Sequence, residues 1–279
     1  AQTIVSPNEM ARWARSALRT PRRLVANARD IAEGAVALGA RLQPNVALSI
    51  EGSIGPHRRW TWASTTLADV KRVRVALGGT VNDVVLSAIT RGFRDLLIHR
   101  GDEVEGVVVR TLVPVSVRTS GDHSFNNQVS GMIAELPVGI ADPLERFGAV
   151  RAQMTDLKES HQADAGGAIS ELAAFTPPLL LAIGFRTAVT VLRRAPQRSV
   201  NTVTTNVPGP QIPLYACGRE MLDYRPFVPL SHGVRTGVAI LSYNGRVSFG
   251  VTGDWDSVPD VDVLAGGIEQ GVTELLALS

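Results

Sequence analysis

Asn82 and Asp83, a carboxamide followed directly by a carboxylate, are the candidate functional residues of this sequence. A carboxamide donates and accepts hydrogen bonds, whereas an ionised carboxylate only accepts them, so the pair could hold a ligand or brace a neighbouring loop. Asp83 also stands three residues after Thr80, which is the spacing of a helix capping box. The alternative is that Asp83 only caps the helix and Asn82 is a solvated residue of its first turn.

The side chains that usually perform acid–base or nucleophilic chemistry are isolated from one another. The five histidines lie at positions 57, 99, 123, 161 and 232. Two arginines follow His57 and oppose its protonation, and His99 falls near a helix end, where it can simply face the dipole or solvent. The single cysteine, Cys217, stands in a turn-like stretch without an adjacent base. We therefore predict no catalytic residue, no metal site and no intrachain disulfide in this chain.

The element that must position Asn82 is a helix over residues 80–101. Apolar side chains recur at 81, 84, 85, 88, 89, 93, 96 and 97, which is the spacing of one buried helical stripe. Thr80 is a suitable N-cap, Asp83 favours the positive end of the helix dipole, and Gly101 is a natural stop. Asn82 has no packing task in this helix, so its position in the first turn leaves it free to reach a ligand or loop.

The rest of the chain mixes strands and helices. Runs rich in β-branched residues predict strands over 46–50, 60–66, 104–117, 128–138, 199–205, 234–242 and 247–252. Periodic apolar residues predict helices over 67–77, from 142 onward, over 169–194 and over 259–278. Asn244 and Gly245 predict a hairpin turn, and prolines predict a rigid turn over 206–210. This mixture is typical of an α/β layered sandwich over residues 44–279.

Composition and charge exclude several functions. Lys and Arg number 28 against 26 for Asp and Glu, and the net charge of +2 is too small for a dedicated nucleic-acid binder. No apolar run approaches the roughly 20 residues that cross a bilayer, and no glycine pattern matches a phosphate-binding loop. The chain starts at Ala1 without a secretory signal pattern, which fits a fragment or a cleaved precursor.

Residues 1–43 are predicted to form a basic helical lead-in. Arginines stand at 12, 15, 19, 22, 23 and 29, and Trp13, Leu18 and Leu24 supply an apolar side. A basic amphipathic helix can lie on an anionic membrane or lipid droplet. The alternative is a solvated basic face on a helix packed against a preceding part of the protein. We expect a cytoplasmic protein that associates peripherally with membrane or lipid droplets.

The segment around Asn82 resembles the Asn-Asp-Val motif of bacterial wax ester synthase/diacylglycerol acyltransferases. The likeness continues in order through Gly55-Pro56-His57-Arg58-Arg59, Pro114-Val115-Ser116-Val117-Arg118, Asn127-Gln128-Val129, Thr205-Asn206-Val207-Pro208-Gly209-Pro210 and Ser242-Tyr243-Asn244-Gly245. The family's catalytic signature, His-His-x-x-x-Asp-Gly, occurs nowhere in the chain. The resemblance is therefore to the C-terminal part of a longer enzyme of the mycobacterial triacylglycerol synthase type.

The resemblance implies the chloramphenicol acetyltransferase-like fold of coenzyme-A-dependent acyltransferases, in which two similar lobes enclose a tunnel. This chain would be the C-terminal lobe, and the general-base histidine would lie on an N-terminal lobe, carried as a separate or cleaved chain. The implied reaction moves a fatty acyl group from acyl-coenzyme A, a substrate, to diacylglycerol or a long-chain alcohol, with no cofactor. The runner-up is a non-catalytic lipid-binding or interaction domain of the same fold.

The same resemblance suggests roles for twelve residues. Asn82 and Asp83 are expected to support the first lobe's catalytic loop from across the lobe interface. Five polar residues at strand ends or turns are candidates for the substrate tunnel: Ser116, Arg118, Gln128, Asn206 and Ser242. Five cations are candidates to receive the phosphates of coenzyme A: Arg58, Arg59, Lys71, Arg72 and Arg74. Each could equally be a local cap, a turn bond or a solvated charge.

Overall fold

A mixed six-stranded sheet organises the lobe. The computed structural model describes residues 47–116, 129–159, 200–231 and 233–279, all within one compact unit, Pro44–Ser279. The strands lie in the order β2 (Arg58–Thr66), β10 (Arg246–Asp254), β9 (Thr236–Tyr243), β5 (Thr202–Pro208), β3 (Val109–Ser116) and β4 (Val129–Leu136). β5 pairs in parallel with both β9 and β3, and the other neighbouring strands are antiparallel.

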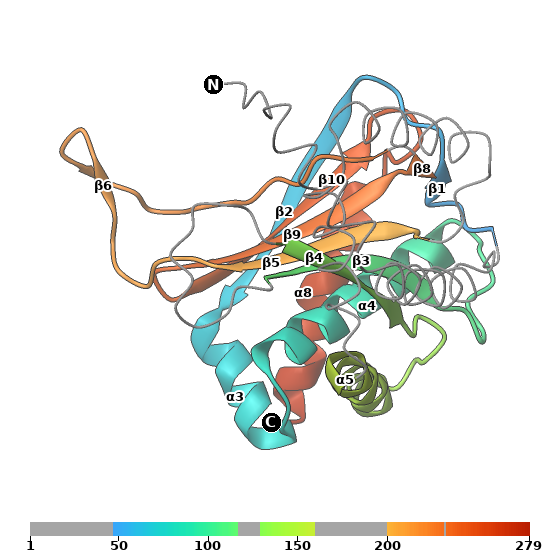
Figure 1. Ribbon diagram of the computed structural model, residues 1–279, viewed down its shortest axis with the longest axis horizontal. Coiled ribbons are helices and arrows are strands. Elements are labelled where there is room, and N and C mark those ends of the chain that lie inside the picture. The colour runs from blue at the N-terminus through green and yellow to red at the C-terminus, as the bar shows by residue number, and fades with distance from the viewer. Residues whose placement is uncertain (1–46, 117–128, 160–199, 232) are drawn as a thin grey trace, which may run out of the picture. The chain divides into compact units, whose positions relative to one another are not determined.

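Helices cover one face of this sheet, which makes the two-layer α/β sandwich that the sequence predicts (Figure 1). They are α3 (Leu67–Leu77), α4 (Val81–His99), α5 (Pro143–Glu159) and α8 (Val261–Ala277). α4 contacts the other three helices and contributes buried Val85, Ile89 and Phe93 to the core between the layers. Burying an apolar side chain of this size contributes about 1.5–3 kcal/mol, so α4 is the central element of the fold.

The ends of α4 confirm the predicted capping. The Thr80 hydroxyl accepts from the Asp83 backbone N–H at 3.3 Å, and the Asp83 carboxylate accepts from the Thr80 N–H at 2.7 Å. Gly101, just past the helix, has a φ of +78°, which a glycine adopts without the strain that a Cβ would add. The first turn of α4, which contains Asn82, is therefore fixed at its start.

α4 and α8 cross with their backbones nearly in contact. A Cβ added at Gly92 would lie 2.7 Å from the Leu264 carbonyl oxygen, and one added at Gly267 would lie 2.7 Å from the Gly92 Cα. Only glycine permits this approach, because any side chain would force the two helices apart. The crossing fixes α4 laterally as well as at its N-terminus.

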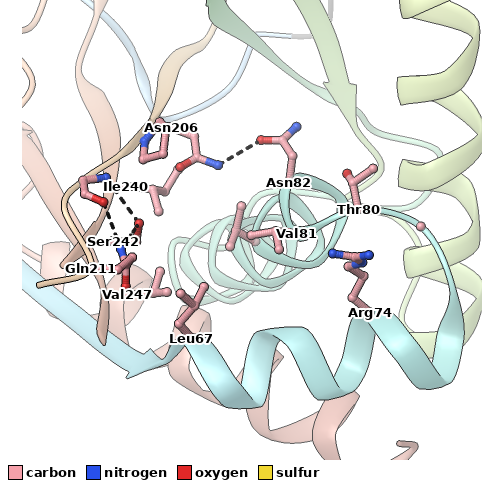
Figure 2. Close-up of a pocket in the computed structure, with 14 residues that line it drawn as sticks. Leu67, Arg74, Thr80, Val81, Asn82, Asn206, Gln211, Ile240, Ser242 and Val247 are labelled. Carbon is pink, nitrogen blue, oxygen red and sulfur yellow. Dashed lines mark hydrogen bonds between the residues drawn. The ribbon is translucent and has the colours of Figure 1, made fainter. Parts of the chain in front are cut away.

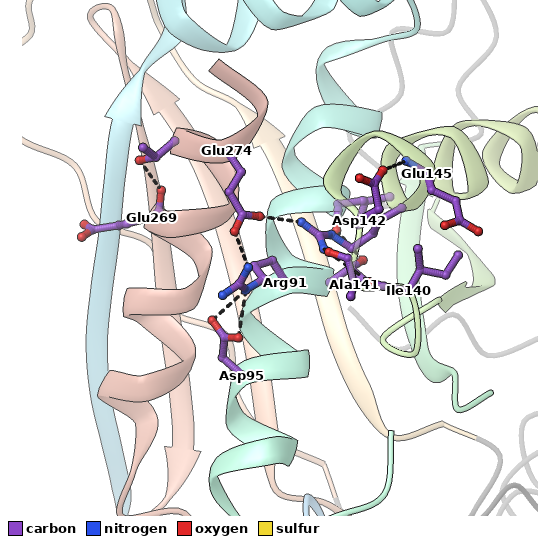
Figure 3. Close-up of polar contacts among 12 residues, drawn as sticks. Arg91, Asp95, Ile140, Ala141, Asp142, Glu145, Glu269 and Glu274 are labelled. Atoms are coloured by element: carbon purple, nitrogen blue, oxygen red, sulfur yellow. Dashed lines mark hydrogen bonds and ion pairs between the residues drawn. The ribbon is translucent and has the colours of Figure 1, made fainter. Parts of the chain in front are cut away.

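A network of charged side chains also joins α4, α5 and α8 (Figure 3). Arg146 of α5 is completely buried and donates to Glu274 of α8 at 2.8 Å, while Arg91 of α4 donates to Glu274 and to Asp95. Burial lowers the pKa of the Arg146 guanidinium, and the bond to Glu274 offsets only part of that effect. Burial also acts to lower the pKa of Arg91, but Asp95 and Glu274 outweigh it and leave that pKa raised. The carboxylate of Glu274 is thus shared by the guanidinium groups of Arg91 and Arg146.

Several short elements complete the described structure. β1 (Glu51–Gly52) pairs with β8 (Gly233–Val234), and β6 (Tyr215–Ala216) pairs with β7 (Arg219–Glu220) in a hairpin that reaches away from the main sheet (Figure 1). The predicted Asn-Gly turn joins β9 to β10, with φ values of +42° at Asn244 and +80° at Gly245. This turn is confirmed, and so are the predicted helices 67–77 and 259–278 and the strand 128–138, to within a few residues.

Four strand or turn predictions are wrong in position. Residues 47–50 form a loop and turn and not a strand. Leu48 and Ile50 are apolar because they are buried in the core, and they do not pair with a neighbouring strand. Arg58 and Arg59 lie in β2 and not in a loop, and β3 begins at Val109 and not at 104. Asn206 belongs to β5, because the parallel ladder with β9 continues through Pro208. The helices predicted over 7–41 and 169–194 lie outside the described residues.

Candidate functional site

An open pocket of about 680 Å³ lies where α3 meets the start of α4 and the ends of β5 and β9 (Figure 2). Its walls combine an apolar part with a polar part. The apolar side chains are Leu67, Val81, Val85, Ile240 and Val247. The polar side chains are Arg74, Thr80, Asn82, Asn206, Gln211 and Ser242. Such a pocket can hold an aliphatic group and hydrogen-bond a polar group at the same time.

The sheet brings these residues together although they are far apart in the sequence. β5 and β9 run in parallel, with Asn206 opposite Ile240 and Pro208 opposite Ser242, so both strands end at the same edge. α4 begins at this edge and directs its N-terminal turn toward the strand ends (Figure 2). Ligand sites of α/β proteins commonly lie at the carboxyl ends of parallel strands, which agrees with the position of this pocket.

Two asparagine side chains meet across the pocket. The Nδ2 of Asn206 donates to the Oδ1 of Asn82 at 3.3 Å, and both residues are partly exposed (Figure 2). The sequence predicts both residues as site candidates, but not that they touch. Asn82 thus reaches a neighbouring strand through its side chain, although a neutral bond of this length contributes only about 0.5–1.5 kcal/mol.

Gln211 and Ser242 fix the turn that follows β5. Gln211 Nε2 donates to the Gly209 carbonyl oxygen and to the Ser242 hydroxyl, each at 3.0 Å, while Gln211 Oε1 accepts from the Gly245 N–H at 3.0 Å. A Cβ at Gly209 would lie 2.2 Å from the Ser242 carbonyl oxygen, so this position requires glycine. Ser242 is a predicted site residue, whereas the sequence reading missed Gln211. A glutamine directly after Pro-Gly-Pro was the signal for it.

Asp83 does not line the pocket. Its side chain is 3% exposed and its Oδ2 bonds the Thr80 N–H. Its Oδ1 has no hydrogen-bond partner among the residues that the structure describes. Asp83 therefore acts as the cap of α4 and supports Asn82 indirectly, by fixing the helical turn to which both belong.

Of the five candidate cations, Arg74 lines the pocket, as Thr80 does (Figure 2). Lys71 and Arg72 are exposed elsewhere on α3, where Arg72 donates to the Ser279 hydroxyl at 3.3 Å. Arg58 and Arg59 lie in β2, outside the pocket. A phosphate-binding role for these five residues stays a prediction. Arg74 is the one of the five that lines the pocket.

Arg58 and Arg59 have contacts that explain them locally. Arg58 donates to the Gly55 carbonyl oxygen at 2.6 Å, and the guanidinium of Arg59 lies 4.0 Å from the centre of the Trp255 ring. Arg58 also faces Asp254 at 3.5 Å. Burial acts to raise the pKa of Asp254, but hydrogen bonds from Ser257 and Gly55, together with the charge of Arg58, leave it lowered. Both arginines therefore help to hold the start of β2 against the end of β10.

The remaining candidates lie elsewhere. Ser116 is the last residue of β3, and Arg118 and Gln128 lie outside the described residues. His57 and His99 are exposed and do not line the pocket, and Cys217 is exposed in the turn of the β6–β7 hairpin. The pocket lining, as far as the structure describes it, contains no histidine, cysteine or carboxylate. The side chains that do line the pocket can orient and hydrogen-bond a substrate, but they supply no general base.

The described part of the chain shows neither a metal-binding cluster nor a single membrane-spanning helix. There, no group of three or more His, Cys, Asp or Glu side chains is arranged to hold a metal ion. No single helix of that part is both long and apolar enough to cross a membrane, and α3 and α4, which meet these criteria only as a pair, are bent by 101° between them.

Solved structures define the class of this fold. The wax ester synthase/diacylglycerol acyltransferase from Marinobacter aquaeolei VT8 superposes with a TM-score of 0.64 at 23% identity, covering 89% of this chain and 56% of that one. The starter condensation domain of rhizomide synthetase superposes with a TM-score of 0.50 at 12% identity, covering 90% of this chain and 52% of that one. The lobe therefore has the coenzyme-A-dependent acyltransferase-like fold, as the sequence predicts.

Family models identify the family within this class. The model described as "WS/DGAT C-terminal domain" matches residues 125–276, which is more than half of the chain. The model described as "Wax ester synthase/diacylglycerol acyltransferase catalytic domain" matches residues 2–85. The chain belongs to the wax ester synthase/diacylglycerol acyltransferase family, which confirms the resemblance found in the sequence.

Curated relatives agree with this assignment. The Mycobacterium tuberculosis H37Rv protein named "Probable diacyglycerol O-acyltransferase tgs1" is 41% identical over 249 residues, which cover 89% of this chain and 53% of that protein. A second M. tuberculosis H37Rv protein with a diacylglycerol O-acyltransferase name is 33% identical over 230 residues, covering 82% of this chain and 46% of that protein. The chain thus spans about half the length of the curated relatives it matches.

Proposed function

We propose that this chain is the C-terminal part of an acyl-coenzyme-A-dependent O-acyltransferase that transfers a fatty acyl group to diacylglycerol and, as a further acceptor, to long-chain alcohols. One observation carries the proposal. The catalytic-domain model ends at residue 85 and includes Arg74 and Asn82, while the C-terminal-domain model contains Asn206, Gln211 and Ser242. Residues from both family domains therefore line one pocket.

The chemistry of acyl transfer sets what this pocket must supply. The acceptor hydroxyl attacks the thioester carbonyl, the carbon–sulfur bond breaks, and the hydroxyl proton ends on the released thiol of coenzyme A. The step needs a base for that proton and hydrogen-bond donors for the oxyanion that forms on the carbonyl oxygen. The described pocket offers amide and hydroxyl donors and the Arg74 cation but no base. We propose that the base lies on the N-terminal lobe and that this chain supplies donors and an apolar wall.

A reconstitution experiment tests this division of labour. Residues 1–279 alone should release no free thiol from palmitoyl-coenzyme A with diacylglycerol or hexadecanol, because we place the base on the N-terminal lobe. The complete protein, with its N-terminal lobe present in the same or a second chain, should release thiol and form triacylglycerol or wax ester. A thiol-reactive dye and thin-layer chromatography of the lipid product measure the two.

Two results would count against the proposal. Turnover by residues 1–279 alone would mean that the base lies in this chain. An inactive complete protein that still binds a fluorescent diacylglycerol analogue would favour the alternative, a non-catalytic lipid-binding domain. The apolar wall of the pocket and its lack of a base in the described residues are what support that alternative.

We also propose that the basic lead-in attaches the enzyme peripherally to a lipid surface, from the sequence of residues 1–43 alone. Replacing Arg12, Arg15 and Arg19 by glutamate should weaken co-sedimentation with anionic vesicles at low salt, because electrostatic attraction is screened least there. Replacing Lys71 by glutamate on the exposed face of α3 provides a single-site control with little expected effect. Unchanged sedimentation of the triple variant would refute the attachment.

A further inference from the structure

The contact between Asn82 and Asn206 gives the two ends of the Asn82 amide different tasks. Its Oδ1 accepts from Asn206 at 3.3 Å. Its Nδ2 points away from Asn206 (Figure 2) and has no hydrogen-bond partner among the described residues. The Asn82 oxygen could accept a second hydrogen bond, but because it is turned toward Asn206, the NH2 end is the one that faces away and is free to donate. The contact therefore determines which end of the Asn82 amide can bind a further group, such as a ligand or another part of the protein.

Both residues of the pair are held by the backbone. Asn82 follows the capped N-terminus of α4, whose position the crossing with α8 also fixes. Asn206 lies in β5, which the parallel ladder with β9 and the Gln211–Ser242 hydrogen bond hold in place. The remaining freedom lies in the side chains: rotation about the Cα–Cβ bond moves the amide, and rotation about the Cβ–Cγ bond exchanges its oxygen and nitrogen. In each residue, that rotation decides between donor and acceptor.

We propose that Asn206 is a positioning residue, which holds Asn82 in the one rotamer that presents its NH2 group as a donor to an oxygen acceptor. The acceptor is either the carbonyl or oxyanion oxygen of the substrate or an oxygen of the N-terminal lobe, which share this chemistry. The inference rests on the proposed acyltransferase function and deepens it. It assigns to Asn206 an action through Asn82, without contact to the reacting atoms.

The proposal predicts an unusual order of damage at position 206 in the complete enzyme. Asn206→Asp keeps the shape of the side chain but can only accept, so it should turn Asn82 round to present Oδ1 and lower kcat at least about tenfold. Asn206→Ala removes the orienting bond without imposing the wrong orientation, and should lower kcat only about threefold. A merely structural contact predicts the reverse order, because aspartate preserves the contact and alanine deletes it.

Controls separate this effect from folding and from the added charge. Melting temperatures of both variants should stay close to the wild type. In the Asn82→Ala background, Asn206→Asp should change kcat by less than about twofold, because its action runs through Asn82. A through-space effect of the new charge would persist in that background. A fall in kcat at constant KM points to an acceptor on the N-terminal lobe or to the oxyanion, and a raised KM points to the ground-state substrate oxygen.

Two outcomes would overturn the inference: Asn206→Ala at least as damaging as Asn206→Asp, or an Asn206→Asp effect that persists without Asn82. An inactive wild-type enzyme would count against the proposed function instead. The test then uses the side-chain 1H–15N signals of Asn82 in the complete protein. These should move downfield in Asn206→Asp, because the NH2 group then donates to a carboxylate, and unchanged signals would refute the inference.

Discussion

Replacing Asn82 by alanine in the complete enzyme is expected to lower turnover at least about tenfold, which corresponds to roughly 1.4 kcal/mol of barrier. Asn82 lies at the pocket and presents an unpartnered NH2 group in the described structure, so its loss removes a donor at the proposed site. The cost in stability should be small, because the bond lost to Asn206 is neutral, long and partly exposed. Steady-state kinetics and a thermal melt measure the two quantities.

The neighbouring residue provides a matched comparison. Asp83→Ala should reduce stability by about 0.5–2 kcal/mol, because it removes the carboxylate that accepts from the Thr80 N–H and caps α4. Turnover should fall as well, since the first turn of α4 carries Asn82. The two variants differ in stability, and only Asp83→Ala should shift the melting temperature appreciably. If Asn82→Ala kept full turnover, or lost turnover only in proportion to stability, Asn82 would be an ordinary first-turn residue without a specific role in the reaction.

Local signals in the sequence predict much of this fold. The apolar spacing and the Thr80, Asp83 and Gly101 signals predict α4 correctly at both ends, because capping depends on residues three or four positions apart. The β9–β10 hairpin follows in the same way from Asn244 and Gly245. Where the boundary depends on distant pairing, prediction is less accurate. Asn206 remains in a strand because β9, more than thirty residues later, continues the ladder beside it.

The site follows the same division. Asn82, Asn206, Ser242 and Arg74 can each be selected from the sequence, through the family resemblance or as a charge on a helix face. Their convergence cannot, because Asn82 and Asn206 are 124 positions apart and meet only through the sheet edge. Gln211 is missed for a related reason: its place after Pro-Gly-Pro marks it as a turn residue, but its bonds to Ser242 and Gly245 join it to residues more than thirty positions away.

Replacing Glu274 by alanine is expected to have the largest effect on stability, a loss of about 3–5 kcal/mol. Glu274 pairs with the guanidinium groups of Arg91 (Figure 3) and Arg146, and Arg146 is completely buried. Without the carboxylate, the partners that Arg146 would keep among the described residues are the carbonyl oxygens of Ile140 and Ala141, at 3.3 and 2.9 Å. Two neighbouring cations would then repel each other in a medium that solvates them poorly.

Hydrogen exchange of the α8 amides in the complete enzyme measures this loss where it occurs, because local protection reports the free energy of opening that helix. Glu105→Ala, a change of the same kind at an exposed position, is the matched control and should stay within about 0.5 kcal/mol of the wild type. A double replacement, Glu274→Leu with Arg146→Met, should recover most of the loss, because apolar side chains remove the cost of burying an unpaired charge. If Glu274→Ala left α8 protection unchanged, the charged network would contribute as little to stability as an exposed ion pair. The position of α4 would then depend on its glycine crossing with α8 and on its N-terminal cap.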